Sequence, residues 1–150
     1  MAGAHIVTQF SISLINKPGV LAQVAKALAD EKVNIVAMTL ADADEHGVMR
    51  LVVEDPTVAR PVLAKLNLPM TETDVLCLEL SNRPGALAAV ATLLAQDHIN
   101  IRYGYVTSGA PGGRTTSIFK VADVNKAIKL LNASGSKHKE PDLGRIAARK

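Results

Sequence analysis

The sequence is poor in aromatic residues and in cysteine, and it contains no tryptophan. The single cysteine, Cys77, excludes an intrachain disulfide, a metal site built from several cysteines and the Cys-x-x-Cys pair of copper chaperones. RNA-recognition modules stack bases on aromatic side chains of a sheet, and two phenylalanines and two tyrosines are too few to build that platform. RNA recognition and copper transport are therefore set aside.

Long apolar runs and targeting signals are missing as well. No stretch approaches the ~18 consecutive apolar residues of a membrane span. The N-terminal residues show no basic region followed by an apolar run, so we see no signal peptide. The default expectation is a cytoplasmic protein without a membrane partner.

Clustered charge is a third absence. The formal net charge is +3, and residues 133–150 account for all of it, because the rest of the chain carries 12 basic and 12 acidic side chains. Nucleic-acid binding needs a clustered cationic face, so we expect no nucleic-acid partner. Residues 133–150 are expected to form a flexible tail, with a contact to a partner as the alternative.

Catalytic and metal-binding motifs are absent too. The four histidines do not repeat between the two halves of the chain, and none belongs to a nucleophile or metal motif. His46 lies beside an acidic stretch at 42–45, where a weakly held cation is one interpretation and a solvated hairpin the other. We therefore expect a protein that is not an enzyme and that uses no metal and no cofactor.

What the sequence does contain is an internal repeat. Residues 16–35 and 82–101 are identical at 11 of 20 positions when aligned without a gap at an offset of 66, and Val58 meets Val124 at the same offset. A repeat of this length has the size of a small domain rather than of a solenoid repeat. Since so small a unit is marginally stable alone, we expect each copy to be buried against the other copy or against a second chain.

Each copy opens with the same three features. A strand with alternating apolar and polar residues is expected at 9–14 and at 75–80. An Asn-x-Pro-Gly turn follows, and the proline suits the first helical position. Apolar residues then recur at helical spacing from Leu21 and from Leu87.

The second half of each copy predicts a hairpin and another helix. The two strands of the hairpin are expected at 35–40 and 48–54 in the first copy, and at 101–107 and 115–121 in the second. Asp123 is suited to cap the following helix. In the first copy Pro61 predicts that this helix either starts late, near Arg60, or is kinked.

A fourth strand would complete a ferredoxin-like βαββαβ unit, an α+β sandwich with helices on one face of an antiparallel sheet. In the first copy residues 69–74 are the candidate. The second copy has loop chemistry after Leu131, whereas the chain begins early, at residues 5–8. We hypothesise an exchange in which residues 5–15 and 70–80 form two long antiparallel strands, and the front of each completes the other unit.

A strand ending in Asn-x-Pro-Gly-x-Leu, then a helix, then Asn-Ile opening a second strand resembles the ACT domain. Both copies carry the pattern, and the resemblance covers residues 5–132, so the chain is similar to stand-alone tandem-ACT proteins. We expect a first ACT domain at 5–74 and a second at 75–132 whose fourth strand comes from residues 5–8. The resemblance implies domain pairing, a homodimer, and binding of an amino acid or related metabolite at the turn between first strand and first helix.

The chemistry of that turn favours a ligand with a carboxylate. A helix N-terminus presents unpaired N–H groups and a partial positive charge, and a glycine there lets a ligand approach the backbone. Asn16 and Asn82 carry both a donor and an acceptor, which suits a zwitterion. We expect the carboxylate to meet the backbone of two segments: Gly19, Val20 and Leu21 in the first copy, and Gly85, Ala86 and Leu87 in the second.

The resemblance also implies a role for further asparagines. Serine-binding ACT domains of a biosynthetic dehydrogenase use two asparagines and a histidine, and the asparagines map to Asn16 with Asn34 and to Asn82 with Asn100. Asn34 and Asn100 would contact the ligand from across the pocket. The histidine is replaced by leucine in both copies, which argues against serine. The bland alternative is that these asparagines only shape turns and helix ends.

Two functions stay open at this point. The chain is a sensor that binds a small molecule, or it is a regulatory subunit that acts by binding a partner enzyme and has no ligand site of its own. The second resembles the small regulatory subunits of acetolactate synthase, which also carry an ACT domain. In either function the signal would be relayed to a regulated enzyme partner through a change in the populations of two arrangements.

Overall fold

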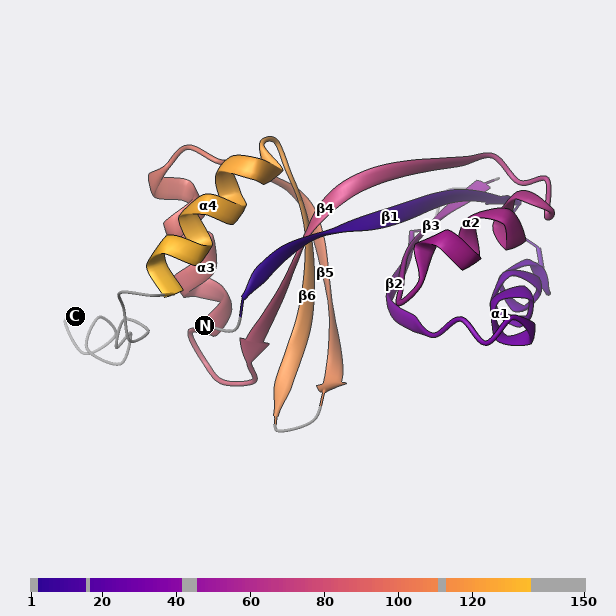
Figure 1. The fold of residues 1–150 in the computed structure, drawn as a ribbon, viewed down its shortest axis with the longest axis horizontal. Coiled ribbons are helices and arrows are strands. Elements are labelled where there is room, and N and C mark those ends of the chain that lie inside the picture. The colour runs from indigo at the N-terminus through magenta and orange to yellow at the C-terminus, as the bar shows by residue number, and fades with distance from the viewer. Residues whose placement is uncertain (1–2, 16, 42–45, 111–112, 136–150) are drawn as a thin grey trace. The chain divides into compact units, whose positions relative to one another are not determined.

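In the computed structural model the described residues are 3–15, 17–41, 46–110 and 113–135 (Figure 1). Six strands and four helices are described, and in chain order they are β1 (Ala4–Ile15), α1 (Val20–Asp30), β2 (Ile35–Ala41), β3 (His46–Val53), α2 (Pro56–Ala64), β4 (Met70–Ser81), α3 (Ala86–Gln96), β5 (Ile101–Ala110), β6 (Arg114–Val121) and α4 (Val124–Gly135). The strands are hydrogen-bonded in the order β2-β3-β1-β4-β6-β5. This confirms the predicted α+β class of two tandem ferredoxin-like units.

The chain folds into two compact units. The first unit is Val7–Asp74, and the second joins the residues up to Ile6 to the chain from Val75 onward. The ends of the long strands β1 and β4 are thereby shared between the units. Within each unit the two helices lie side by side, α1 with α2 and α3 with α4 (Figure 1).

The N-terminal end of β1 belongs to the second unit. Ala4 lies in the apolar core of that unit, and its N–H donates to Oδ1 of Asn132 at 3.3 Å. In the first unit the Ser13 N–H, further along β1, donates to the Pro69 carbonyl at 2.9 Å. Met70, at the start of β4, packs against the core of the first unit. These interactions favour an exchange of strand ends, and we propose domain boundaries at 5–74 and 75–132 on that basis.

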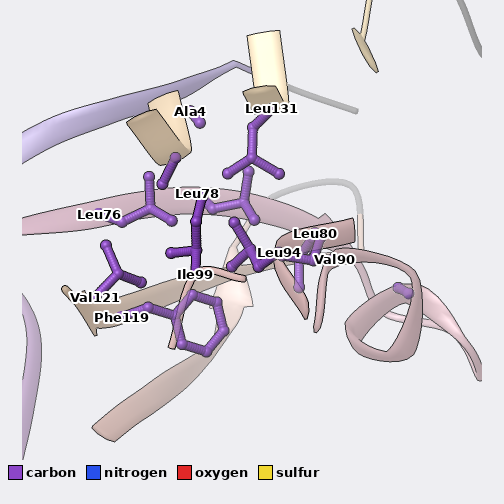
Figure 2. Packing of buried hydrophobic residues seen from close by; sticks show 12 residues of the cluster. Ala4, Leu76, Leu78, Leu80, Val90, Leu94, Ile99, Phe119, Val121 and Leu131 are labelled. Atoms are coloured by element: carbon purple, nitrogen blue, oxygen red, sulfur yellow. The ribbon is translucent and has the colours of Figure 1, made fainter. Parts of the chain in front are cut away.

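The two cores follow from the alternation of side chains along the first strand of each copy. Phe10, Ile12 and Leu14 of β1 lie in the core of the first unit, and Leu76, Leu78 and Leu80 of β4 lie in the core of the second. Figure 2 shows the second core, where leucines from β4, α3 and α4 form one cluster with Phe119. Successive residues of a strand point to opposite faces. The apolar residues of the alternating pattern therefore share one face, and that face forms part of the core of each unit.

The repeat changes its offset in the hairpin. Before the hairpin the copies correspond at 66 residues, whereas beyond it Leu51 and Phe119 occupy the same position, because they pair with Phe10 and Leu76. The offset there is therefore 68. Val58 and Val124 therefore do not occupy the same structural position, because the hairpin of the second copy is two residues longer than that of the first.

The second helix of each copy starts at an aspartate. The Val58 N–H donates to Oδ1 of Asp55 at 3.2 Å, and the Lys126 N–H donates to Oδ1 of Asp123 at 3.0 Å, which confirms the cap predicted at Asp123. The late start predicted for the helix in the first copy is wrong. With Asp55 as cap and a proline suited to the first helical position, α2 begins at Pro56 and contains Pro61.

Candidate functional site

Each unit has a hollow at the turn between its first strand and its first helix. The hollow of the first unit has a volume of about 310 Å³ and is lined by Leu14, Ile15, Lys17, Val20, Leu21, Leu40, Ala41 and Gly47. We call it the first hollow. The second hollow has a volume of about 190 Å³ and is lined by Leu80, Ser81, Asn82, Arg83, Ala86, Leu87, Val106, Thr115 and Ser117.

The two hollows lie at corresponding positions of the repeat. Most lining residues of the first have a counterpart in the second, at an offset of 66 before the hairpin and 68 after it: Leu14 with Leu80, Ile15 with Ser81, Lys17 with Arg83, Val20 with Ala86, Leu21 with Leu87, Leu40 with Val106, and Gly47 with Thr115. A depression that arises twice at one place is a property of the repeated architecture. This makes the strand-to-helix turn the candidate site.

The helix that borders each hollow starts without a side-chain cap. Gly19 and Gly85 are the N-cap residues, with φ of 90° and 89°, a left-handed conformation that glycine adopts without strain. Glycine has no side-chain oxygen that could accept from the first-turn N–H groups, which have no partner within the helix. In the second unit the Ala86 N–H makes one long bond, 3.4 Å, to the Arg83 carbonyl. Unpaired N–H groups at a helix start are suited to an anion.

The charges around both helix starts favour an anion. The first turns of α1 and α3 carry no acidic residue, so the partial positive charge of the helix end is not offset there. Lys17 lines the first hollow and Arg83 lines the second. Sequence reasoning missed both cations. The signal was available, because a basic residue stands at the same position of both Asn-x-Pro-Gly turns.

The predicted site residues are placed unevenly. Five of the ten line a hollow: Val20, Leu21, Asn82, Ala86 and Leu87. Gly19 and Gly85 adjoin the hollows as N-caps. Asn16 lies outside the described residues. Ligand contact by any of the ten stays a prediction.

Asn34 and Asn100 do not line either hollow. The side chain of Asn34 donates from Nδ2 to Oε1 of Glu54 at 3.0 Å, and its carbonyl accepts from the Glu54 N–H at 3.0 Å. The Asn100 carbonyl accepts from the Ala122 N–H at 3.2 Å in the same way. The two asparagines therefore tie the helix-to-strand connection to the end of the third strand in each copy.

The walls of the two hollows differ in polarity. Among the described residues that line the first hollow, Lys17 has the only polar side chain, whereas the second hollow contains the hydroxyls of Ser81, Thr115 and Ser117. The Thr115 hydroxyl donates to the Leu80 carbonyl at 3.3 Å. Ser117 is fully buried, and its Oγ has no hydrogen-bond partner. An unsatisfied buried hydroxyl costs about 1–3 kcal/mol, so Ser117 is expected to reduce the stability of the protein.

The other candidates offer no reaction centre. Cys77 is a free, buried thiol, and burial, with a smaller contribution from Glu79, raises its pKa. Within the described ranges no group of three His, Cys, Asp or Glu side chains is arranged to hold a metal. The acidic stretch at 42–45 beside His46 lies outside those ranges. Across the same part of the chain, no helix has the length and apolar character that crossing a bilayer requires.

Comparison with known proteins adds a family and a set of structural neighbours. A family model described as an ACT domain pair matches residues 5–139. A protein of known structure from Bacteroides thetaiotaomicron is 30% identical, with 88% of this chain and 90% of that chain covered and a TM-score of 0.81. No curated protein sequence matches.

Two further neighbours share the fold at lower identity. The ligand-free regulatory subunit of aspartate kinase from Thermus thermophilus is 15% identical over 88% of this chain and 96% of that chain, with a TM-score of 0.65. The corresponding subunit from Thermus flavus is 19% identical over 89% and 97%, with a TM-score of 0.53. At these identities the likeness establishes the fold alone.

Proposed function

Because this chain belongs to the ACT domain pair family, we propose that it is a non-catalytic regulatory protein that binds a small carboxylate, in the first instance an amino acid. The observation that supports this most strongly is the pair of corresponding hollows, each bordered by a helix N-terminus and by a cationic side chain. Both features attract a negative charge. Among the described residues that line them, neither hollow contains a histidine, a cysteine or a carboxylate.

In the first hollow the ligand's carboxylate would accept hydrogen bonds from the N–H groups of Val20 and Leu21, with Lys17 as its counter-ion. In the second hollow the Leu87 N–H and the Arg83 guanidinium would have these roles. Asn82 would orient the ligand's ammonium group, as would Asn16 in the first copy. The binding mode does not depend on Asn34 and Asn100, which are tied to the third strands.

Regulation would follow from a difference in affinity between two arrangements of the protein. A ligand shifts such an equilibrium only as far as it binds one arrangement more tightly than the other. The signal would pass to an enzyme partner, as in the solved neighbours that are named as regulatory subunits of aspartate kinase. Their likeness supports the fold only, so the partner of this chain is part of our proposal.

Exposed apolar side chains favour a second function, the binding of a partner enzyme without any ligand. Ile15 and Leu40 are exposed beside the first hollow, and Leu87 and Val106 are exposed beside the second. The edge strands β2 and β5 also offer hydrogen-bonding groups to another chain. A homodimer formed through these edges would use the same features, and we propose that oligomeric state here.

A thermal-shift screen against the twenty amino acids separates the two functions. Ligand binding to the native state stabilises it by about 2.7 kcal/mol at 100 times the dissociation constant, so at least one amino acid should raise the melting temperature. The double variant Lys17→Met with Arg83→Met should lose that shift, because both counter-ions are gone. Lys65→Met removes an exposed lysine away from the hollows and should keep it. No shift across the whole panel would favour the partner-binding subunit.

A further inference from the structure

We propose that the two hollows have diverged in ligand class, an inference that rests on the proposed function. The first hollow takes a carboxylate with a branched aliphatic side chain. The second takes a smaller carboxylate whose side chain carries a hydroxyl, and Ser117 is the residue that recognises it. The evidence is the position of Ser117, the state of its hydroxyl and the polarity of the walls around it.

Ser117 occupies a position that is apolar in the other copy. It pairs with Leu78 across β4 and β6, and Met49 pairs with Ile12 at the corresponding place in the first unit. Directly opposed residues of two paired strands share one face of the sheet, so Ser117 lies on the same core side as Leu78. Met49 is fully buried there. The replacement of a methionine by a serine puts a small polar group where the architecture otherwise places an apolar one.

The hydroxyl of Ser117 has unused hydrogen-bonding capacity. Its Oγ is buried and has no hydrogen-bond partner within the protein, while the residue itself lines the second hollow. Thr115 also lines that hollow, but its hydroxyl already donates to the Leu80 carbonyl. A serine hydroxyl can both donate and accept, so a hydroxyl on the ligand would satisfy it in either sense. A purely apolar ligand would leave it unsatisfied.

Two further wall positions change in the same direction. Ser81 in the second hollow corresponds to Ile15 in the first, and Thr115 corresponds to Gly47. The second hollow is also smaller, about 190 Å³ against about 310 Å³. Polarity and size therefore agree: a compact polar ligand fits the second hollow and a bulkier aliphatic ligand fits the first.

Access to Ser117 requires the rim of the hollow to move. Ser117 has no exposed surface, whereas Leu87 and Val106 in the lining are 51% and 52% exposed. Side chains with half of their surface in solvent change rotamer readily. The ligand would displace them outward and reach the hydroxyl.

L-valine and L-threonine are the decisive pair of probes, because they differ by a methyl group in place of a hydroxyl at nearly equal volume. Arg83→Met leaves only the first hollow with its counter-ion, and Lys17→Met leaves only the second. By calorimetric titration, Arg83→Met should bind L-valine about tenfold or more tightly than L-threonine, since an apolar wall disfavours the hydroxyl. Lys17→Met should show the reverse order, by about threefold to tenfold.

Removing the hydroxyl of Ser117 tests the residue itself. Lys17→Met with Ser117→Ala should bind both probes equally, whereas Lys17→Met with Thr116→Val, which removes the neighbouring hydroxyl of β6, should keep the threonine preference. In the absence of ligand, Ser117→Ala should unfold at the same temperature as the wild type or higher, since an unsatisfied polar group is lost. A clearly lower unfolding temperature would mean that Ser117 has a structural partner, and would overturn the inference.

The remaining outcomes separate this inference from the proposed function. Equal affinity for both probes in Lys17→Met, or a threonine preference that survives Ser117→Ala, would overturn the division of ligand classes and leave carboxylate binding intact. If the wild type binds neither probe, the division of ligand classes is wrong. The proposed function is wrong as well only if none of the twenty amino acids raises the melting temperature.

Discussion

Gly104 illustrates how closely the residues of the second unit are matched. It lies in β5 opposite Phe119 of β6, and a Cβ added there would approach Cδ1 of the ring to 2.5 Å and the Ile118 carbonyl oxygen to 3.1 Å. Its counterpart in the first copy is Met38, opposite Leu51. The larger aromatic residue on one strand is therefore accommodated by the missing side chain on the other.

Gly104→Ala should lower the stability of the protein, because the added methyl group would force the Phe119 ring or the strand to move. Overpacking of this kind costs about 1–3 kcal/mol. Urea unfolding would measure the change. Gly3→Ala is the matched control, since a Cβ at Gly3 would meet nothing within 4 Å. If both variants unfold at the same urea concentration as the wild type, the close contact with Phe119 has no energetic weight.

The asparagines show why residue identity alone misleads about a site. Asn34 and Asn100 recur at the same place in both copies, and the family resemblance implied that they contact the ligand. In the structure neither lines a hollow, and the side chain of Asn34 donates to Glu54 instead. Lys17 and Arg83 also recur as basic residues, and they do line the hollows. A single sequence does not say which repeated residue has folding as its cause and which has a ligand.

At the scale of the elements, α2 is held to β4 by one ion pair. Arg60 on α2 donates to both oxygens of the Glu72 carboxylate, from Nη2 to Oε1 at 2.7 Å and from Nε to Oε2 at 2.9 Å and to Oε1 at 3.0 Å. The hydrogen bonds from Arg60 lower the pKa of Glu72. The pair is exposed, so salt should weaken it.

The lowered pKa of Glu72 predicts a loss of stability in acid. Stability from a carboxylate whose pKa is depressed by folding is present above the unfolded pKa and is lost as the pH falls through the folded pKa. Arg60→Met should therefore have a lower melting temperature than the wild type near pH 7. On acidification its melting temperature should fall by less than that of the wild type, because the variant has no ion pair to lose. Scans from pH 7 to pH 3 at low salt would measure this, with Lys65→Met as the control. Parallel pH profiles for wild type and Arg60→Met would contradict the role of the pair.

Most elements could be predicted from the sequence because their patterns are local. The alternating residues of β1 and β4, and the glycines before α1 and α3, are signals within a few residues. The start of α2 was missed although Asp55 followed by Pro56 is a strong start signal, because Pro61 was given more weight. The shift from 66 to 68 was missed because the copies were compared without a gap, while the two aspartate caps stand 68 apart.

At the scale of the whole molecule, the repeat determined the fold class, and the two hollows follow from it as a consequence of the same turn formed twice. The proposed exchange of strand ends came from the sequence, because residues 5–8 precede the first copy and the second copy has no fourth strand of its own after Leu131. The polarity of the second hollow could not be predicted, since it depends on which strand residues pair beneath the helix start. The register of β6 against β4 places Ser117 there. This register could not be predicted from the repeat, because the two hairpins differ in length.

Nuclear magnetic resonance of the backbone amides offers the most direct test of carboxylate binding at the helix starts. The protein would be titrated with the amino acid that gives the largest thermal shift. We predict that the largest chemical-shift changes belong to the first-turn amides of α1 or α3, which are Val20 and Leu21 or Leu87. These changes should disappear in the Lys17→Met, Arg83→Met double variant. Shift changes that gather away from both helix starts, with these amides unmoved, would contradict the account.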